Sequence, residues 1–181
     1  MPLLSSDTYT TDYIYALPQG RRAELIDGRI YDMAPPNLLH QELVSELIYL
    51  IRDHIRKHGG SCRALAAPLA VFLNADDKNY VEPDISVICD KDRLDEKGCH
   101  GAPDWIIEIV SPSTQQMDYG IKLFKYRAAN VREYWIVNPA TQTVNVFDFE
   151  HEKMTCQYGF DDEIRSCIFH DLIIRFADLT E

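Results

Sequence analysis

The stretch of residues 81–126 most constrains the fold, because two apolar segments in it each carry an acidic residue. Residues 81–88 (VEPDISVI) contain Asp84, and residues 103–110 (PDWIIEIV) contain Glu108. Side chains of a β-strand alternate between the two faces of a sheet, so Glu108 shares a face with aliphatic neighbours two positions away. An ionised carboxylate is costly to bury in such surroundings. We therefore expect Glu108 to be neutral, ion-paired or bound to a cation.

A strand, a helix and a second strand are expected to follow one another between residues 104 and 137. Residues 104–110 and 133–137 have the composition of strands, and residues 113–116 fit a capping box that begins a helix extending to about Ala129. The apolar residues expected to form the buried stripe of this helix are Met117, Ile121, Phe124 and Ala128. This order predicts two parallel strands joined by a right-handed crossover.

The flanking segments predict a hairpin and a long helix. Residues 23–33 alternate around Asp27-Gly28, a dipeptide that favours a tight hairpin turn. Residues 38–58 form an amphipathic pattern that begins after Asn37, a good helix cap, and ends at Gly59-Gly60. We expect this helix to lie against a sheet.

The remaining segments complete an α/β protein with one mixed sheet flanked by helices. Further strands are expected in residues 62–73, 81–89, 144–149, 154–158 and 168–176. Residues 1–18 are polar and are expected to form an irregular N-terminal arm, with a contact among Tyr9, Tyr13 and Tyr15. The whole chain, residues 1–181, is predicted to be a single domain.

Composition limits the location and the partners of the protein. The chain has 181 residues, of which 46% are hydrophobic and 26% charged, and its net charge is −11. We expect no secretory signal and no membrane-spanning segment. The five cysteines (Cys62, Cys89, Cys99, Cys156 and Cys167) contain no CxxC pair, so we predict reduced thiols in a cytoplasmic protein. The acidic balance argues against a large non-specific nucleic-acid footprint.

Asp84 and Glu108 are the best candidates for metal ligands. If their strands are neighbours, both carboxylates can project from one edge of the sheet, where two oxygen ligands suit a hard cation such as Mg²⁺. Asp104 also follows a proline, but it lies four residues before Glu108, roughly 13 Å along an extended strand. It is therefore too distant to share an ion with Glu108. Without a metal, a buried ion pair with Lys122 would account for Glu108.

Supporting roles are predicted for side chains from three other elements. Lys122 lies on one helix face with Asp118 and Tyr126, each about one turn away, and either leans over Glu108 or forms a solvated ion pair with Asp118. His40 either contacts the site from the long helix or is a core histidine. Glu24 either joins the site from the hairpin or is an exposed strand carboxylate.

At these residues the chain resembles the PD-(D/E)xK nuclease superfamily, and in particular a bacterial family of restriction-endonuclease-like proteins. The resemblance extends over residues 24–149 and is carried by the segments 24–28, 40–41, 82–86, 101–104, 107–114, 118–126 and 133–137. It implies an αβββαβ core, here with additional C-terminal β-hairpins. It further implies dependence on Mg²⁺ or Mn²⁺, a DNA substrate and frequent homodimers.

The resemblance also assigns residues, with one departure from the superfamily pattern. It places the metal-binding acids at Asp84 and Glu108, and it expects a lysine at position 110, where this chain has Val110. In the restriction-endonuclease-like family the matching lysine is on the helix, at Lys122. The predicted catalytic set is therefore Asp84, Glu108 and Lys122, supported by His40, Glu24 and Tyr126.

Three functional hypotheses follow from the sequence. The first is an Mg²⁺-dependent endonuclease that hydrolyses phosphodiester bonds of DNA. The second, favoured by Val110 and by the acidic charge, is a protein of the same fold that binds nucleic acid or a protein partner without cutting. The third is a structural domain in which Glu108 and Lys122 form a buried ion pair.

Overall fold

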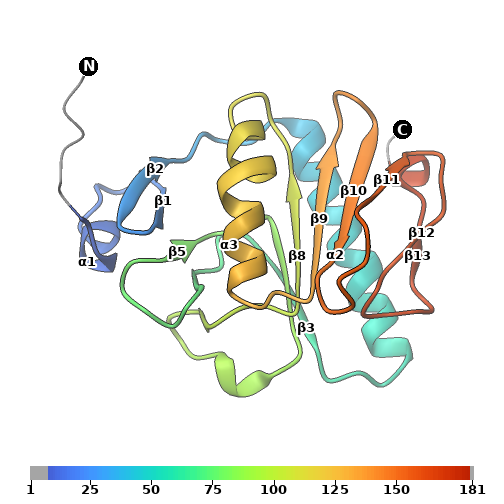
Figure 1. Ribbon diagram of the computed structural model, residues 1–181, viewed down its shortest axis with the longest axis horizontal. Helices are drawn as coiled ribbons and strands as arrows, with labels where there is room; N and C mark the ends of the chain where they lie inside the picture. The colour runs from blue at the N-terminus through green and yellow to red at the C-terminus, as the bar shows by residue number, and fades with distance from the viewer. Residues whose placement is uncertain (1–7, 180–181) are drawn as a thin grey trace.

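A six-stranded mixed sheet forms the centre of the protein in the computed structural model, which describes residues 8–179 (Figure 1). The strand order is β11-β10-β9-β8-β6-β3. The bounds are β3 (Arg63–Ala66), β6 (Ile85–Ile88), β8 (Trp105–Ile109), β9 (Glu133–Asn138), β10 (Thr143–Asp148) and β11 (Cys156–Gly159). Helix α2 (Leu38–Lys57) covers one face and α3 (Leu123–Ala128) the other. The predicted α/β class, with helices on both faces of a mixed sheet, is confirmed.

The strand–helix–strand unit has the predicted direction. Strands β8 and β9 are parallel, with Trp105 opposite Glu133 and Ile109 opposite Val137. The other neighbours in this sheet are antiparallel, so the mixed character comes from this one crossover. The buried side chains of β8 alternate between the two faces of the sheet, as predicted. Glu108 lies on the face that α3 covers.

Helix α2 forms as the sequence predicts. The side chain of Asn37 accepts a hydrogen bond from the backbone N–H of His40 at 2.9 Å, which caps the first turn. The residues that α2 buries against the sheet are Leu43, Val44, Leu47, Ile51 and Ile55. After the helix ends, Gly59 has a φ of +63°, a conformation that a residue without a Cβ adopts without strain.

A second sheet carries the predicted hairpin. Its order is β2-β1-β5-β4-β7, with bounds β1 (Ala23–Ile26), β2 (Arg29–Asp32), β4 (Val71–Phe72), β5 (Tyr80–Val81) and β7 (Cys99–His100). Asp27 and Gly28 both have positive φ, as a tight hairpin turn requires. Residues 62–73 form two strands, β3 and β4, which belong to different sheets.

The predicted single strand over residues 81–89 is wrong. It is divided into β5 and β6, which lie in different sheets, and the chain changes sheet at Glu82, Pro83 and Asp84. Pro83 has no N–H to give to a ladder, and the N–H of Glu82 bonds to the side chain of Glu24 instead of a neighbouring strand. This break places Asp84 immediately before the first residue of β6.

The helix after β8 turns a different face to the core than predicted. It contains the π-helical segment η2 (Met117–Lys122) followed by α3, and its buried residues are Asp118, Lys122 and Tyr126. Ile121 is 40% and Phe124 is 74% exposed, so the expected buried stripe is wrong. The polar row faces inward because Lys122 pairs with carboxylates on the sheet, and this interaction determines the orientation of the helix.

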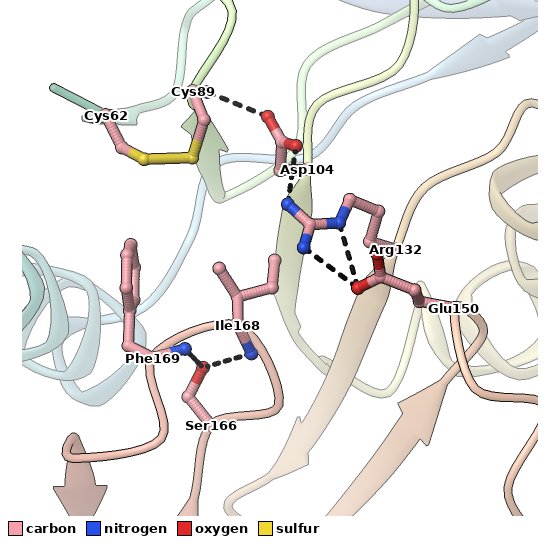
Figure 2. Close-up of a disulfide and its surroundings, with 8 residues drawn as sticks. All are labelled: Cys62, Cys89, Asp104, Arg132, Glu150, Ser166, Ile168 and Phe169. Carbon is pink, nitrogen blue, oxygen red and sulfur yellow. Dashed lines mark hydrogen bonds and ion pairs between the residues drawn. A yellow bond between two sulfur atoms is a disulfide. The ribbon is translucent and has the colours of Figure 1, made fainter.

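The prediction of five reduced thiols is also wrong. Cys62 and Cys89 form a disulfide with an S–S distance of 2.08 Å (Figure 2), and Cys99, Cys156 and Cys167 are free. Arg63 and Ile88 are opposite each other in the antiparallel strands β3 and β6. Cys62 directly precedes Arg63 and Cys89 directly follows Ile88, which brings the two cysteine side chains together. Within residues 8–179, none of the helices combines the length and the apolar composition that crossing a bilayer would require.

The chain ends differ in detail from expectation. Residues 11–15 of the predicted irregular arm form a short helix, α1 (Thr11–Tyr15), and the rings of Tyr9 and Tyr13 are 4.7 Å apart. The first seven residues of the predicted arm lie outside the described residues. The C-terminal hairpins are present as β10–β11 and β12–β13, with β12 at Ile164–Arg165 and β13 at Ile173–Ile174. The second pair is shorter than the predicted strand because residues 168–172 turn.

Candidate active site

Asp84 and Glu108 lie side by side, as predicted. Strands β6 and β8 are antiparallel neighbours with Ile85 opposite Ile107, which brings the residue before β6 next to the middle of β8. The Asp84 Oδ2 atom accepts a hydrogen bond from the backbone N–H of Ile109 at 2.7 Å. The backbone N–H of Asp84 lies 3.4 Å from Glu108 Oε2. The break before β6 thus aims one carboxylate at the strand that carries the other.

One oxygen of Glu108 is held by two donors from the helix. The ammonium of Lys122 donates to Glu108 Oε1 at 2.9 Å, and the hydroxyl of Tyr126 donates to the same atom at 2.6 Å. Glu108 is 4% exposed, and its other oxygen, Oε2, has only the long contact to Asp84. The helix therefore fixes the orientation of the Glu108 carboxylate and leaves Oε2 on the side of Asp84.

Lys122 is surrounded by three carboxylates. Besides Glu108, its Nζ atom lies 2.9 Å from Glu24 Oε2 and 3.7 Å from Asp118 Oδ1. The side chain of Lys122 is 6% exposed, and Asp118 is 2% exposed, so the alternative of a solvated surface pair is wrong. Two of these carboxylates, Glu24 and Glu108, lie within hydrogen-bond distance of the ammonium, and Asp118 lies slightly farther away.

Glu24 and His40 join the site from two more elements. Glu24 is 4% exposed, which excludes the exposed-strand alternative, and its Oε1 accepts a hydrogen bond from the N–H of Glu82 at 3.0 Å. His40, on the first turn of α2, places Nε2 3.1 Å from Asp84 Oδ2. All six residues predicted from the sequence are therefore brought together, and Asp118 is a seventh that sequence reasoning had left as a surface partner of Lys122.

Burial and repulsion from neighbouring acids raise the pKa values of Glu108 and Asp118. The pKa of Glu108 is raised well above its usual value, first by burial and then by Asp84, Asp118 and Glu24, although Lys122 opposes the shift. Burial raises the pKa of Asp118 to about 6 against the same opposition. Burial alone would lower the pKa of Lys122, but attraction from Glu108, Glu24 and Asp118 raises it. The cluster holds more negative charge than its single lysine offsets.

The donor set fits one hard divalent cation with an incomplete protein shell. Glu108 Oε2 has only its long contact to Asp84, and Asp84 Oδ1 has no hydrogen-bond partner among the described residues. Within residues 8–179 no three histidine, cysteine or acidic side chains form a metal-ligand group. Asp84 and Glu108 are thus the two candidate ligands. Mg²⁺ commonly binds through one or two carboxylates and completes its shell with water and phosphate oxygens.

Asp104 and the histidine pair His54 and His58 lie outside this cluster. Asp104 accepts hydrogen bonds from Arg132 at 3.1 Å and from the backbone N–H of Cys89 at 2.7 Å, as Figure 2 shows. His54 and His58 stack with ring centroids 4.1 Å apart. The Pro-Asp dipeptide at Asp104 therefore stabilises loops, whereas the one at Asp84 reaches the cluster.

Comparison with known proteins identifies the family. Residues 10–173 match the model of the Uma2 family, described as "Putative restriction endonuclease". The chain belongs to the Uma2 family. An uncharacterized protein of Synechocystis sp. is 28% identical to this Uma2 protein over 131 residues, which are 71% of this chain and 67% of the relative. The resemblance to restriction-endonuclease-like proteins is confirmed.

A solved structure has the same fold. The crystal structure of a putative nuclease from Anabaena variabilis superposes with a TM-score of 0.75 at 26% identity and covers 94% of this chain and 96% of its own. The αβββαβ arrangement of this Uma2 protein is therefore a nuclease-like fold.

Position 110 holds a buried valine in this Uma2 protein, and the amine beside Glu108 comes from the helix. Val110 is 8% exposed and packs in the apolar cluster beside Ile106 and Tyr126, and its N–H bonds to Val137 at 2.8 Å. The ammonium of Lys122 reaches Glu108 from the helix instead. The chain therefore has no cationic side chain at position 110, and the cation beside Glu108 is Lys122 on the helix.

Proposed function

We propose that this Uma2 protein is an endonuclease that hydrolyses phosphodiester bonds of DNA with Mg²⁺ or Mn²⁺. The observation that carries the proposal is the pair Asp84 and Glu108, held side by side by neighbouring strands, with an oxygen of each left without a close protein donor. Membership in a family described as restriction endonucleases supports it, as does the likeness to a protein named a nuclease.

In this proposal Asp84 and Glu108 hold the ion. A bound Mg²⁺ or Mn²⁺ supplies activation of a water molecule and offsets negative charge on the transferring phosphate. The Asp84 carboxylate is oriented for this role by the N–H of Ile109 on β8 and by the imidazole of His40 on α2. Glu108 is oriented by Lys122 and Tyr126, which bind the oxygen that points away from Asp84.

Lys122 acts through Glu108. Its donors face Glu108, Glu24 and Asp118, and its side chain is almost fully buried, so none is directed at a substrate. The ammonium opposes the rise in the pKa of Glu108 that burial and repulsion cause, and so favours the ionised form that binds metal over the protonated form. Glu24 holds Lys122 in place from the hairpin.

A second function remains in competition: binding of nucleic acid or of a protein partner without cleavage. The net charge of −11 and the valine at position 110 favour it. It requires no metal at Asp84 and Glu108, so metal-dependent cleavage separates the two.

The test is nicking of supercoiled plasmid DNA in Mg²⁺, in Mn²⁺ and in EDTA. We expect cleavage by the wild type only with metal, and a loss of at least about a hundredfold in Asp84→Ala and Glu108→Ala. Asp104→Ala is the matched control, because Asp104 also follows a proline before a strand of the same sheet but binds Arg132. Cleavage that persists in both site variants would remove the proposal.

A further inference from the structure

The proposed site needs a cation that faces the substrate, and Lys122 does not supply it. Its side chain is 6% exposed and its ammonium faces carboxylates. A DNA strand approaching a chain of net charge −11 gains affinity only where positive side chains are accessible. Arg22 is linked to Glu24 of the site through Glu82, and its side chain is 38% exposed.

Arg22 is anchored on a buried carboxylate. Its Nε donates to Glu82 Oε2 at 2.7 Å, and its Nη2 pairs with the same oxygen. The side chain of Glu82 is 8% exposed, and its other oxygen accepts the hydroxyl of Tyr80 at 2.7 Å. Both interactions use the same edge of the guanidinium. The Nη1 group has no partner among the residues that the structure describes, so a fixed and partly solvated arginine retains donors for a second anion.

The anchor of Arg22 is continuous with the candidate active site. The N–H of Glu82 donates to Glu24 at 3.0 Å, and Glu24 pairs with Lys122 at 2.9 Å. Glu82 also precedes Asp84 by only two residues. Arg22 therefore stands at the accessible end of a chain of contacts that begins at the two candidate metal ligands.

We propose that Arg22 binds a backbone phosphate of DNA beside the bond to be cut, with Glu82 holding the guanidinium in position. This inference rests on the proposed function for its substrate. A planar guanidinium with free N–H groups suits phosphate oxygens, and pre-positioning by a buried carboxylate lowers the entropy lost on binding. The simpler alternative is that Arg22 only neutralises Glu82.

The neighbouring arginine provides a matched control. Arg21 is 62% exposed and pairs at 3.1 Å with Asp32, which is 68% exposed. This pair lies on the surface of the hairpin, and no interaction among residues 8–179 joins it to the acidic cluster. Both arginines add one positive charge, but only Arg22 is tied to the site.

The experiment measures binding of a fluorescein-labelled 30-base-pair DNA duplex by anisotropy, in EDTA and in Ca²⁺, from 50 to 300 mM salt. We expect Arg22→Ala to bind about tenfold more weakly at 0.1 M salt and to lower the slope of log K against log salt by about 0.9, the loss of one phosphate contact. Arg21→Ala should keep the wild-type slope. The double variant R22A/E82Q should bind as weakly as Arg22→Ala, since removing the Glu82 charge does not restore a phosphate contact.

These measurements distinguish phosphate binding by Arg22 from simple neutralisation of Glu82. Equal slopes for Arg22→Ala and Arg21→Ala, or wild-type binding by R22A/E82Q, would overturn the role of Arg22, and so would a wild type that does not bind the duplex. Plasmid cleavage tests the proposed function separately. A wild type that cleaves while Arg22→Ala binds normally refutes only this inference, whereas a wild type that binds through Arg22 but never cleaves refutes only the nuclease.

Discussion

Glu108 on β8 and Glu133 on β9 are both buried glutamates of the central sheet, yet their carboxylates meet different kinds of partner. Glu133 is fully buried and accepts hydrogen bonds from Trp135 Nε1 at 2.6 Å, Ser166 Oγ at 2.9 Å and the N–H groups of Cys167 and Ile168 at 2.9 and 3.0 Å. Each oxygen of Glu133 has two donors, and none of these donors carries a charge. Glu133 therefore ties the C-terminal segment to the sheet.

Glu108 has the opposite arrangement. Two donors share one oxygen, the other oxygen is almost free, and three further carboxylates lie close enough to raise its pKa. A carboxylate that serves only stability would be satisfied at both oxygens, as Glu133 is. The excess of acids around Glu108 destabilises the folded state, and clusters of this kind are typical of functional sites.

The largest expected difference in stability is between the single truncations of the two glutamates. Glu133→Ala removes the acceptor of four buried donors and should lower the free energy of unfolding by about 3–5 kcal/mol. Glu108→Ala relieves repulsion and leaves Lys122 with Glu24 and Asp118, so we expect a loss below about 2 kcal/mol. Urea unfolding of both variants in EDTA measures the difference. Equal losses would show that the two glutamates have the same structural role.

The pH dependence of stability should separate the cluster from the rest of the chain. The pKa of Asp118 is about 6 in the folded protein, above its ordinary value, so the folded state binds the proton more tightly. The contribution of Asp118 is therefore fully favourable below about pH 4 and is lost as pH rises through 6. The stability of Asp118→Asn relative to the wild type should rise by about 2–3 kcal/mol between pH 4 and pH 7, since one pKa unit is worth about 1.4 kcal/mol. A constant difference across this range, in urea unfolding without metal, would contradict the assignment.

The smallest effect is expected on the outer face of the helix that holds Lys122. Phe124 is 74% exposed, so Phe124→Ala should change the free energy of unfolding by less than about 0.5 kcal/mol. The control is Phe176→Ala, because Phe176 is fully buried and its truncation should cost about 3–5 kcal/mol. Thermal unfolding followed by circular dichroism compares them. A large loss at Phe124 would mean that the apolar stripe, and not the polar row, faces the core.

The sequence predicted the class of fold from local signatures, and the family resemblance named the six candidate side chains that the structure brings together. Alternation of apolar residues gives the strands, Asn37 and Gly59 bound the long helix, and Asp27-Gly28 marks the hairpin turn. The convergence of Asp84 and Glu108 followed from expecting their strands to be neighbours. The strand, helix and turn signals depend on residues within a few positions of each other.

The features that sequence reasoning missed depend on tertiary partners. The helix after β8 carries two candidate faces, and the one with Phe124 is the more apolar. The cluster of acids on the sheet selects the other face, because Lys122 must reach Glu108 and Glu24. Asp118 is buried for the same reason. The disulfide likewise requires the β3–β6 register, which no cysteine spacing reveals.

The proposed function requires Asp84 and Glu108 to form one metal site, and calorimetric titration with Mn²⁺ tests this directly. The wild type should bind one Mn²⁺, and both Asp84→Asn and Glu108→Gln, which retain size and remove charge, should bind at least about tenfold more weakly. Mn²⁺ binding that is equally tight in Glu108→Gln and the wild type, or a wild type that binds none, would contradict the account.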